Sequence, residues 1–171
     1  MLISDEYKAQ QREMHNTLPN YGVASVSFAP LVTKYLDQLE VTDLLDYGCG
    51  KGRLAQSITP DHALDITQYD PGIDGLDELP MPAEMVCCID VLEHIEPELL
   101  DNVLDDLKRV TMRYGFFSVH TGAAAKTLPD GRNAHLIQEN YEWWLPKFME
   151  RFHIHSFMHN PAGFHMLCQP R

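Results

Sequence analysis

Three glycines at alternate positions follow a short apolar run in "LLDYGCGKGRL", residues 44–54, and Asp46 precedes them. Such glycines let the backbone approach a ligand closely. Lys51 suggests a phosphate ligand, but a phosphate-binding P-loop needs Ser or Thr after the lysine, and a dinucleotide fingerprint needs glycine where Arg53 stands. A carboxylate at Asp46 would repel a pyrophosphate and could hold an ammonium group, directly or through water.

A second carboxylate, Asp70, closes the next predicted strand, 24 residues after Asp46. The carboxyl ends of neighbouring parallel strands meet at one sheet edge, where a carboxylate can accept hydrogen bonds from both hydroxyls of a ribose. The two acids together predict a ligand that joins a nucleoside to a cationic tail.

Three histidines are the candidate catalytic bases. His94 follows the predicted strand 85–90, His120 ends the predicted strand 115–120, and His135 lies in the loop after it. All three are expected at the carboxyl edge of the sheet, where a histidine of near-neutral pKa can take a proton. For His94, orienting its neighbours or capping a helix is an equal alternative.

The long segment 120–144 is interpreted as a lid over the acceptor. Arg132 could grip a carboxylate or phosphate, and Trp143 or Trp144 could stack on a planar acceptor. The alternatives are that Arg132 meets a surface carboxylate, that one Trp packs in the core, and that Tyr21 is a packing residue. The predicted substrate contacts are Tyr21, Arg132, Asn133, His135 and Trp143.

A second histidine group lies in "HIHSFMH" and consists of His153, His155 and His159, which are separated by even numbers of residues. Alternate strand positions share a face, but no cysteine or carboxylate stands at ligand spacing beside them. No metal site is expected, and these histidines are interpreted as surface or packing residues.

The elements that position these residues alternate between strand and helix. Helices are predicted at residues 4–15, 29–39, 52–58, 97–110 and 140–152, the last kinked or broken near Pro146. Strands are predicted at residues 43–48, 63–71, 85–90, 115–120, 152–158 and 163–169, with a tight turn before the last. This order predicts an α/β fold with a mostly parallel sheet and one antiparallel strand.

Composition indicates one globular domain over residues 1–171, with a helical segment at 1–40 and an α/β core at 41–171. No apolar run could cross a bilayer and no secretory signal is evident, so a cytoplasmic protein with four reduced cysteines is expected. The net charge of −12 disfavours duplex nucleic acid as a partner.

The motifs "LDYGCGKG", "YDP" and "CCIDVLEHIEPE" resemble those of class I S-adenosylmethionine-dependent methyltransferases, which have a Rossmann-like fold. More narrowly, "YGVASVSFAP" and "LPDGRNAHLI" resemble a compact group common in phages and prophages. The resemblance implies that the glycine loop faces the methionine part of the cofactor and that Asp70 binds its ribose. The implied cofactor contacts are Asp46, Tyr47, Gly48, Cys49, Gly50, Asp70, Pro71, Asp90, Val91 and Leu92.

The chain departs from that family between Asp70 and Met85, where only 14 residues stand. This is too short for the helix and third strand that the family carries there, so both are predicted to be reduced or absent. Leu79 is the expected replacement for the lost adenine contact.

The resemblance implies methyl transfer to a small-molecule or nucleotide acceptor by in-line displacement, with S-adenosyl-L-homocysteine as product. The motifs of DNA amino-methyltransferases and of cytosine-C5 enzymes are missing. A sensor or partner subunit that binds S-adenosylmethionine without catalysis is the alternative, and cleavage of the cofactor is a third. A monomer or homodimer is expected.

Overall fold

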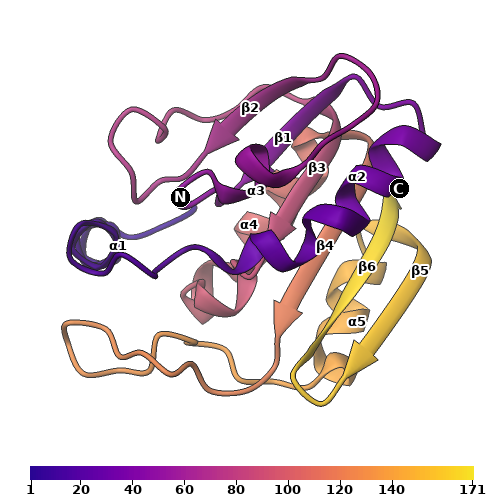
Figure 1. Ribbon diagram of the computed structural model, residues 1–171. Coiled ribbons are helices and arrows are strands. Elements are labelled where there is room, and N and C mark those ends of the chain that lie inside the picture. The colour runs from indigo at the N-terminus through magenta and orange to yellow at the C-terminus, as the bar shows by residue number, and fades with distance from the viewer.

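A six-stranded sheet in the order β2-β1-β3-β4-β6-β5 organises the molecule in the computed structural model, which describes residues 1–171 (Figure 1). The strands are β1 (Asp43–Tyr47), β2 (Asp65–Tyr69), β3 (Ala83–Ile89), β4 (Thr111–His120), β5 (Phe152–Asn160) and β6 (Gly163–Pro170). Strands β1 to β4 pair in parallel, and β6 runs antiparallel to both β4 and β5. The predicted mostly parallel sheet with a reversed last strand is confirmed.

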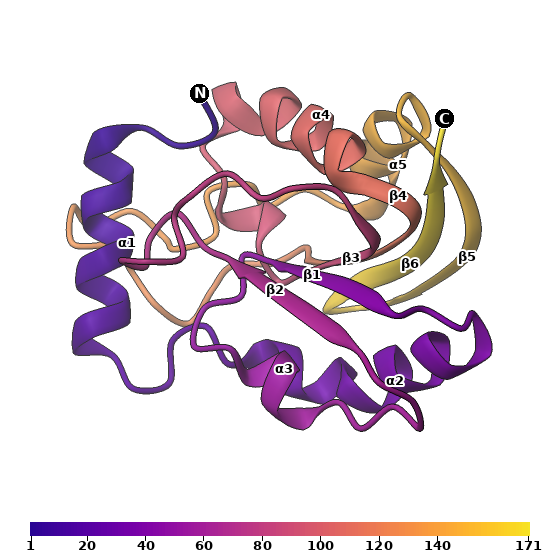
Figure 2. The same cartoon turned by 90° about the horizontal axis from the view of Figure 1, so that it is seen from above.

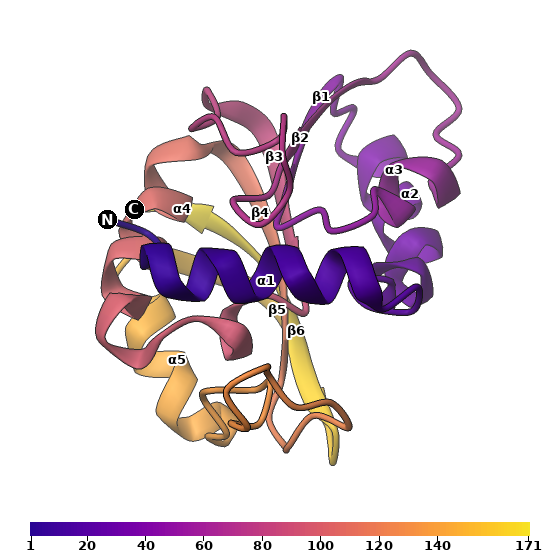
Figure 3. The ribbon, with the colours of Figure 1, turned by 90° about the vertical axis from the view of Figure 1, so that its left-hand side faces the viewer.

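Helices cover both faces of this sheet, as Figures 2 and 3 show. The helices are α1 (Asp5–Thr17), α2 (Ala29–Gln38), α3 (Arg53–Ser57), α4 (Leu100–Val110) and α5 (Tyr141–Met149). Short 3-10 helices lie at Ala24–Phe28, Leu92–His94 and Pro97–Leu99. α2 and α3 pack on one face and α4 and α5 on the other. None of the helices is both long and apolar enough to cross a bilayer.

The central strands are apolar on both faces because each face is covered. Leu44 and Cys87 belong to the core that contains α2, whereas Leu45 and Cys88 belong to the core that contains α4 and α5. Neighbouring residues of a strand point to opposite faces, so the vicinal cysteines lie in different layers. All four cysteines are free and buried. Burying each large apolar side chain of these two cores contributes roughly 1.5–3 kcal/mol to the free energy of folding.

The segment between β2 and β3 is as short as the sequence predicts. It contains neither helix nor strand, and β2 is consequently an edge strand. Leu79, which lies in this segment, is 66% exposed. The predicted absence of a further strand and helix in this segment is therefore confirmed.

Two local predictions differ from the structure. α5 runs unbroken through Pro146 and ends at Met149. Proline removes only one backbone N–H from the helical ladder, and the fully buried Trp144 and Phe148 anchor the helix on either side of it. The 3-10 helix at Ala24–Phe28 was not predicted, because it has no side-chain cap and no buried residue to give a periodic pattern.

α1 lies across the edge of the sheet where the parallel strands end, beside the loop of residues 121–140 (Figures 1 and 3). Ser4 caps this helix, as predicted, by accepting a hydrogen bond from the backbone N–H of Tyr7. Ser4 also donates its hydroxyl to Glu96 at 2.6 Å, which ties the start of α1 to the segment before α4. Lys8 and Arg12 pair with Asp77 in the segment after β2.

Candidate active site

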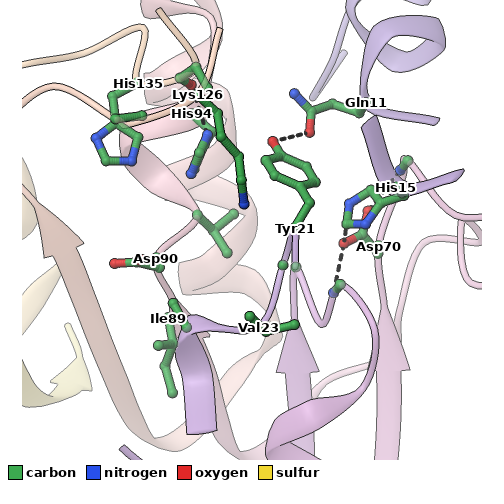
Figure 4. A pocket seen from close by; sticks show the side chains of 18 of the residues that line it. Gln11, His15, Tyr21, Val23, Asp70, Ile89, Asp90, His94, Lys126 and His135 are labelled. Atoms are coloured by element: carbon green, nitrogen blue, oxygen red, sulfur yellow. Dashed lines mark hydrogen bonds and ion pairs between the residues drawn. The ribbon is translucent and has the colours of Figure 1, made fainter. Parts of the chain in front are cut away.

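A cavity of about 500 Å³ opens at this edge of the sheet. Its walls come from α1, residues 20–25, the glycine loop, the ends of β2 and β3, and the 121–140 loop. Figure 4 shows Gln11, His15 and Asp70 on one side of the cavity and His94, His135 and Lys126 on the other. We call these two sides the Asp70 side and the histidine side.

The glycine loop forms part of the Asp70 side. Gly48 and Gly50 have φ angles of 75° and 53°, in the left-handed region that favours glycine. A Cβ atom on Gly50 would lie 2.8 Å from the carbonyl oxygen of Gly22, and one on Gly48 would collide with Val91. Glycine is therefore needed at both positions for conformation and for close packing.

Asp70 anchors the glycine loop from the end of β2. Its two carboxylate oxygens accept backbone N–H hydrogen bonds, one from Gly50 at 2.9 Å and one from Gly72 at 2.8 Å. Nε2 of His15 lies 4.0 Å from the same carboxylate. Each oxygen has a further lone pair, so Asp70 keeps acceptor capacity toward the cavity.

Asp46 lies beneath the loop and does not line the cavity. Its Oδ2 atom is buried without a hydrogen-bond partner. Burial and the nearby charge of Asp70 raise the pKa of Asp46 to about 7. This side chain thus contributes a buried charge that titrates near neutral pH.

Three other expected cofactor contacts lie away from the cavity. Tyr47 is buried against Tyr69 and donates its hydroxyl to Asp106 of α4, and Leu92 is fully buried in the core beside α4. Leu79 is exposed on the surface. Tyr47 and Leu92 thus serve packing and Leu79 lies in solvent, so none of the three lines the cavity. Cys49, Pro71, Asp90 and Val91 do line the cavity.

Lys51, which suggested a phosphate ligand in the sequence, forms no ion pair with a carboxylate. Its Nζ atom donates to the backbone carbonyl of His15 at 2.8 Å. Because His15 lies in the last turn of α1, this bond fastens α1 to the glycine loop.

The histidine side begins at the end of β3, where Asp90 has a φ angle of 57°. A non-glycine residue in this left-handed region is strained, and such strain clusters at functional sites. His94, His120 and His135 all line the cavity. The ring of His135 lies 4.7 Å from that of His94 and 4.9 Å from that of His120, centroid to centroid.

Glu93 supports this side from the core. It is fully buried, and its Oε1 accepts the backbone N–H of His120 at 2.6 Å, while Oε2 has no partner. Burial and the charge of Asp90 raise the pKa of Glu93 well above its usual value. Sequence reasoning missed this residue because a Glu before a His at a helical start reads as a solvated surface residue.

Tyr21 lies between the two sides. Its hydroxyl donates to Gln11 of α1 at 2.7 Å, and its ring packs edge-on against His15 and His94 (Figure 4). Burial raises the pKa of Tyr21 to about 12, so the phenol is neutral at physiological pH. Gln11 and His15 were also missed, although their i,i+4 spacing places them on one face of α1.

Most of the predicted lid does not reach the cavity. Arg132 pairs with Asp130 on the surface, and Trp143 stands under Lys147 in α5, whereas the loop residues that line the cavity are 123–126, 134 and 135. Asn133 joins the two strands of the loop, because its Oδ1 accepts the N–H groups of Ala124 and His135. Trp144 is the tryptophan in the core.

The histidines of β5 lie apart from this cavity. His153, His155 and His159 are exposed, and His155 bonds to Gln169 at 2.7 Å. The one group of three side chains with metal-ligand spacing is Asp37, Asp61 and His62 on the surface. Both nitrogens of His62 are engaged there, and its Nε2 lies 2.6 Å from the carbonyl of Val41.

Comparison with solved structures shows the fold. The chain is similar to 1,6-didemethyltoxoflavin-N1-methyltransferase of Burkholderia thailandensis, crystallised with S-adenosylhomocysteine, at 14% identity and a TM-score of 0.69 over 96% of this chain and 89% of that one. It is similar to the N-methyltransferase NodS of Bradyrhizobium japonicum WM9, also crystallised with S-adenosylhomocysteine, at 11% identity and a TM-score of 0.61 over 95% of this chain and 98% of that one. It is also similar to the small RNA methyltransferase HEN1, at 12% identity and a TM-score of 0.65 over 86% of this chain and 25% of that one.

These likenesses show that the chain shares a Rossmann-like fold with these structures. No protein-family model matches the sequence, and no curated protein matches it either. The fold is therefore established by structure alone.

Proposed function

We propose that this chain binds S-adenosylmethionine in the cavity and transfers its methyl group to a small-molecule or nucleotide acceptor. The observation that carries this proposal is that one continuous cavity joins the glycine loop and Asp70 to three histidines and Asp90. A ligand held on the Asp70 side would direct a reactive group at the histidine side. The fold, shared with methyltransferases that bind S-adenosylhomocysteine, supports the same activity.

The residues of the Asp70 side suit this cofactor. Asp70 has free lone pairs for ribose hydroxyls, and the glycine loop offers a backbone surface without side chains for the methionine part. The unpartnered Oδ2 of Asp46 beneath the loop and the carboxylate of Asp90 favour a cationic ligand. Cys49, Pro71 and Val91 complete the proposed binding wall.

S-adenosylmethionine brings a methyl group that is already activated by the positive sulfur. The chain then has to hold an acceptor in line with that methyl group, exclude water and accept a proton where the acceptor loses one. We propose that His94, His120 and His135 exclude water and accept the proton. Tyr21 closes the cavity between the two sides.

The test is incubation of the full chain with methyl-labelled S-adenosylmethionine and fractions of cell extract. The proposal predicts transferred label in one fraction together with S-adenosylhomocysteine. Saturable binding with no transfer to any fraction would favour the alternative, a sensor or partner subunit. Loss of S-adenosylmethionine with the label kept on a sulfur-containing fragment, and without formation of S-adenosylhomocysteine, would indicate cleavage of the cofactor instead.

A further inference from the structure

We propose that the acceptor is an amine or hydroxyl compound on an apolar body, rather than an anion, and that His135 takes the proton that methyl transfer releases. This inference rests on the proposed function. It deepens that function by naming the chemical class that the histidine side can hold.

The backbone fixes the hydrogen-bonding state of two histidines. Nδ1 of His94 lies 2.8 Å from the carbonyl oxygen of Ala134, and Nδ1 of His135 lies 2.7 Å from that of Gly122. A carbonyl oxygen only accepts hydrogen bonds, so each Nδ1 carries the hydrogen and each Nε2 is left with a lone pair. Neither Nε2 has a protein partner, and both side chains line the cavity. Each can therefore accept a hydrogen bond from a donor group of the acceptor molecule.

The charges around these nitrogens oppose an anion. Asp90 adds a carboxylate, and no arginine lines the cavity. Lys126 is the one lysine there, and one of its three N–H groups donates to the carbonyl of Asn20 at 2.6 Å while its ammonium group lies over the Tyr21 ring. A phosphate or carboxylate would meet this single cation but also two lone pairs and the Asp90 carboxylate, whereas an N–H or O–H group meets acceptors.

The rest of this side is apolar. Ile95 follows His94 directly, and Ala124 and Ala134 belong to the loop segments that hold His135. Nδ1 of His120 lies 3.1 Å from the backbone nitrogen of Gly122 and 3.3 Å from its carbonyl oxygen, so the backbone does not fix the tautomer of this ring. One polar group on an apolar body matches this wall better than a multiply charged ligand does.

The two lone pairs differ in their ability to take a proton. Burial and the neighbouring His135 lower the pKa of His94 to about 3, so it stays neutral and serves to orient the donor. Burial also lowers the pKa of His135, but the charge of Asp90 acts in the opposite direction and stabilises its protonated form. The groups that face His135 are Asp90 from the end of β3, His94 from the 3-10 helix and His120 from β4.

The step balances without any further reagent. The acceptor's N or O forms a bond to the methyl carbon while the sulfur–methyl bond breaks and its electron pair stays on sulfur. The proton of the acceptor's N–H or O–H passes to Nε2 of His135 and then to solvent. No oxidation or reduction occurs.

The test uses the full chain, labelled with ¹⁵N-histidine and saturated with S-adenosylhomocysteine, and four probes that share one ring: benzylamine, phenol, benzoate and phenyl phosphate. Nitrogen chemical shifts report both the tautomer and the contact. The proposal predicts that benzylamine or phenol shifts Nε2 of His94 and His135, and that the two anions bind at least about tenfold more weakly. The exposed His153 is the internal control.

Stronger shifts from benzoate or phenyl phosphate, or no response of either nitrogen to both donors, would overturn the acceptor class. Hydrogens found on Nε2 instead of Nδ1 would overturn it as well. Failure of S-adenosylhomocysteine to bind at all would instead overturn the proposed function, so the two failures are distinguishable.

The assignment of the base is tested by transfer of labelled methyl to benzyl alcohol, whose hydroxyl does not ionise in the range used, across pH. His135→Gln should slow transfer by about 10²-fold or more and remove its rise with pH, while the control His153→Gln changes neither. Unchanged thermal melting of His135→Gln checks its fold, and retained Nε2 shifts of His94 check its site. If His94→Gln removes the pH dependence and His135→Gln keeps it, the assignment is wrong.

Discussion

Asp70 is the residue on which proposed binding depends most, because it connects the glycine loop to the cavity. Replacement by Asn puts an NH2 group against a backbone N–H of Gly50 or Gly72 and removes the charge. We expect Asp70→Asn to weaken S-adenosylmethionine binding by about 1–3 kcal/mol. The measurement is the ligand-induced shift in melting temperature.

The matched control for this prediction is Asp65→Asn. Asp65 begins the same strand, β2, at the end away from the cavity, and it is exposed. It should bind as the wild type does. If the Asp70→Asn variant and the wild type bind S-adenosylmethionine with equal affinity, Asp70 is not part of the site.

We predict that the protonation of Asp46 makes the stability of the folded chain depend on pH. Its pKa of about 7 in the folded chain lies above the ordinary value of 3.8, so the folded state binds the proton more tightly than the unfolded state does. The resulting stabilisation is present at low pH and is lost as pH rises from about 4 to about 7. Asp46→Asn should therefore gain melting temperature relative to the wild type at pH 8 and not at pH 4.

The comparison of the two proteins isolates Asp46 from Glu93, whose pKa is also raised. Melting curves from pH 4 to pH 8 give the difference directly. A constant difference between wild type and Asp46→Asn over this range would show that Asp46 does not titrate near neutrality.

In the glycine loop, two alanine variants can separate the effect of backbone strain on stability from the effect of close packing on ligand binding. Gly50 and Gly75 both have positive φ angles, but a Cβ on Gly50 meets Gly22, whereas one on Gly75 meets nothing within 4 Å. Both alanine variants should lose about 1–2 kcal/mol of folding free energy from strain. Only Gly50→Ala should also lose ligand affinity.

Chemical unfolding and calorimetric binding of both variants check this. Equal losses of affinity in Gly50→Ala and Gly75→Ala would mean that the packing of the glycine loop against residues 20–25 has no part in binding.

Helix α1 supplies Gln11 and His15 to the cavity and is held by Lys51 and by ion pairs to Asp77. Most of these contacts are exposed or partly exposed and individually weak. We expect saturating S-adenosylhomocysteine to slow amide hydrogen exchange in α1 and to leave α4, which lies on a sheet face, unchanged. Identical exchange in α1 with and without ligand would contradict a role for this helix in binding.

At the scale of the whole molecule, the fold followed from the sequence because several local signals agreed. Apolar strands, the buried stripe of α4 and the short segment after Asp70 all pointed to the same shortened sheet. The predicted break near Pro146 was wrong because burial of Trp144 and Phe148 outweighs one missing hydrogen bond, and the alternative of a kink stays a prediction. Tertiary packing, which a local pattern does not contain, decided that helix.

The candidate site was only half predictable. Asp70, Asp90 and the three histidines follow strand ends, so topology alone brings them to one edge. Gln11, His15 and Glu93 reach the site through the path of α1 and through burial, for which the sequence has no local signal. Arg132 and Asn133 look functional by type, but hydrogen bonds within their own loop satisfy them.

Binding of S-adenosylmethionine in this cavity is tested by a calorimetric titration of the full chain with S-adenosylhomocysteine, because binding needs neither an acceptor nor turnover. We expect one saturable site per chain, weakened in Asp70→Asn and unchanged in Asp65→Asn. The absence of saturable heat with the folded protein, at ligand concentrations up to the millimolar range, would contradict it.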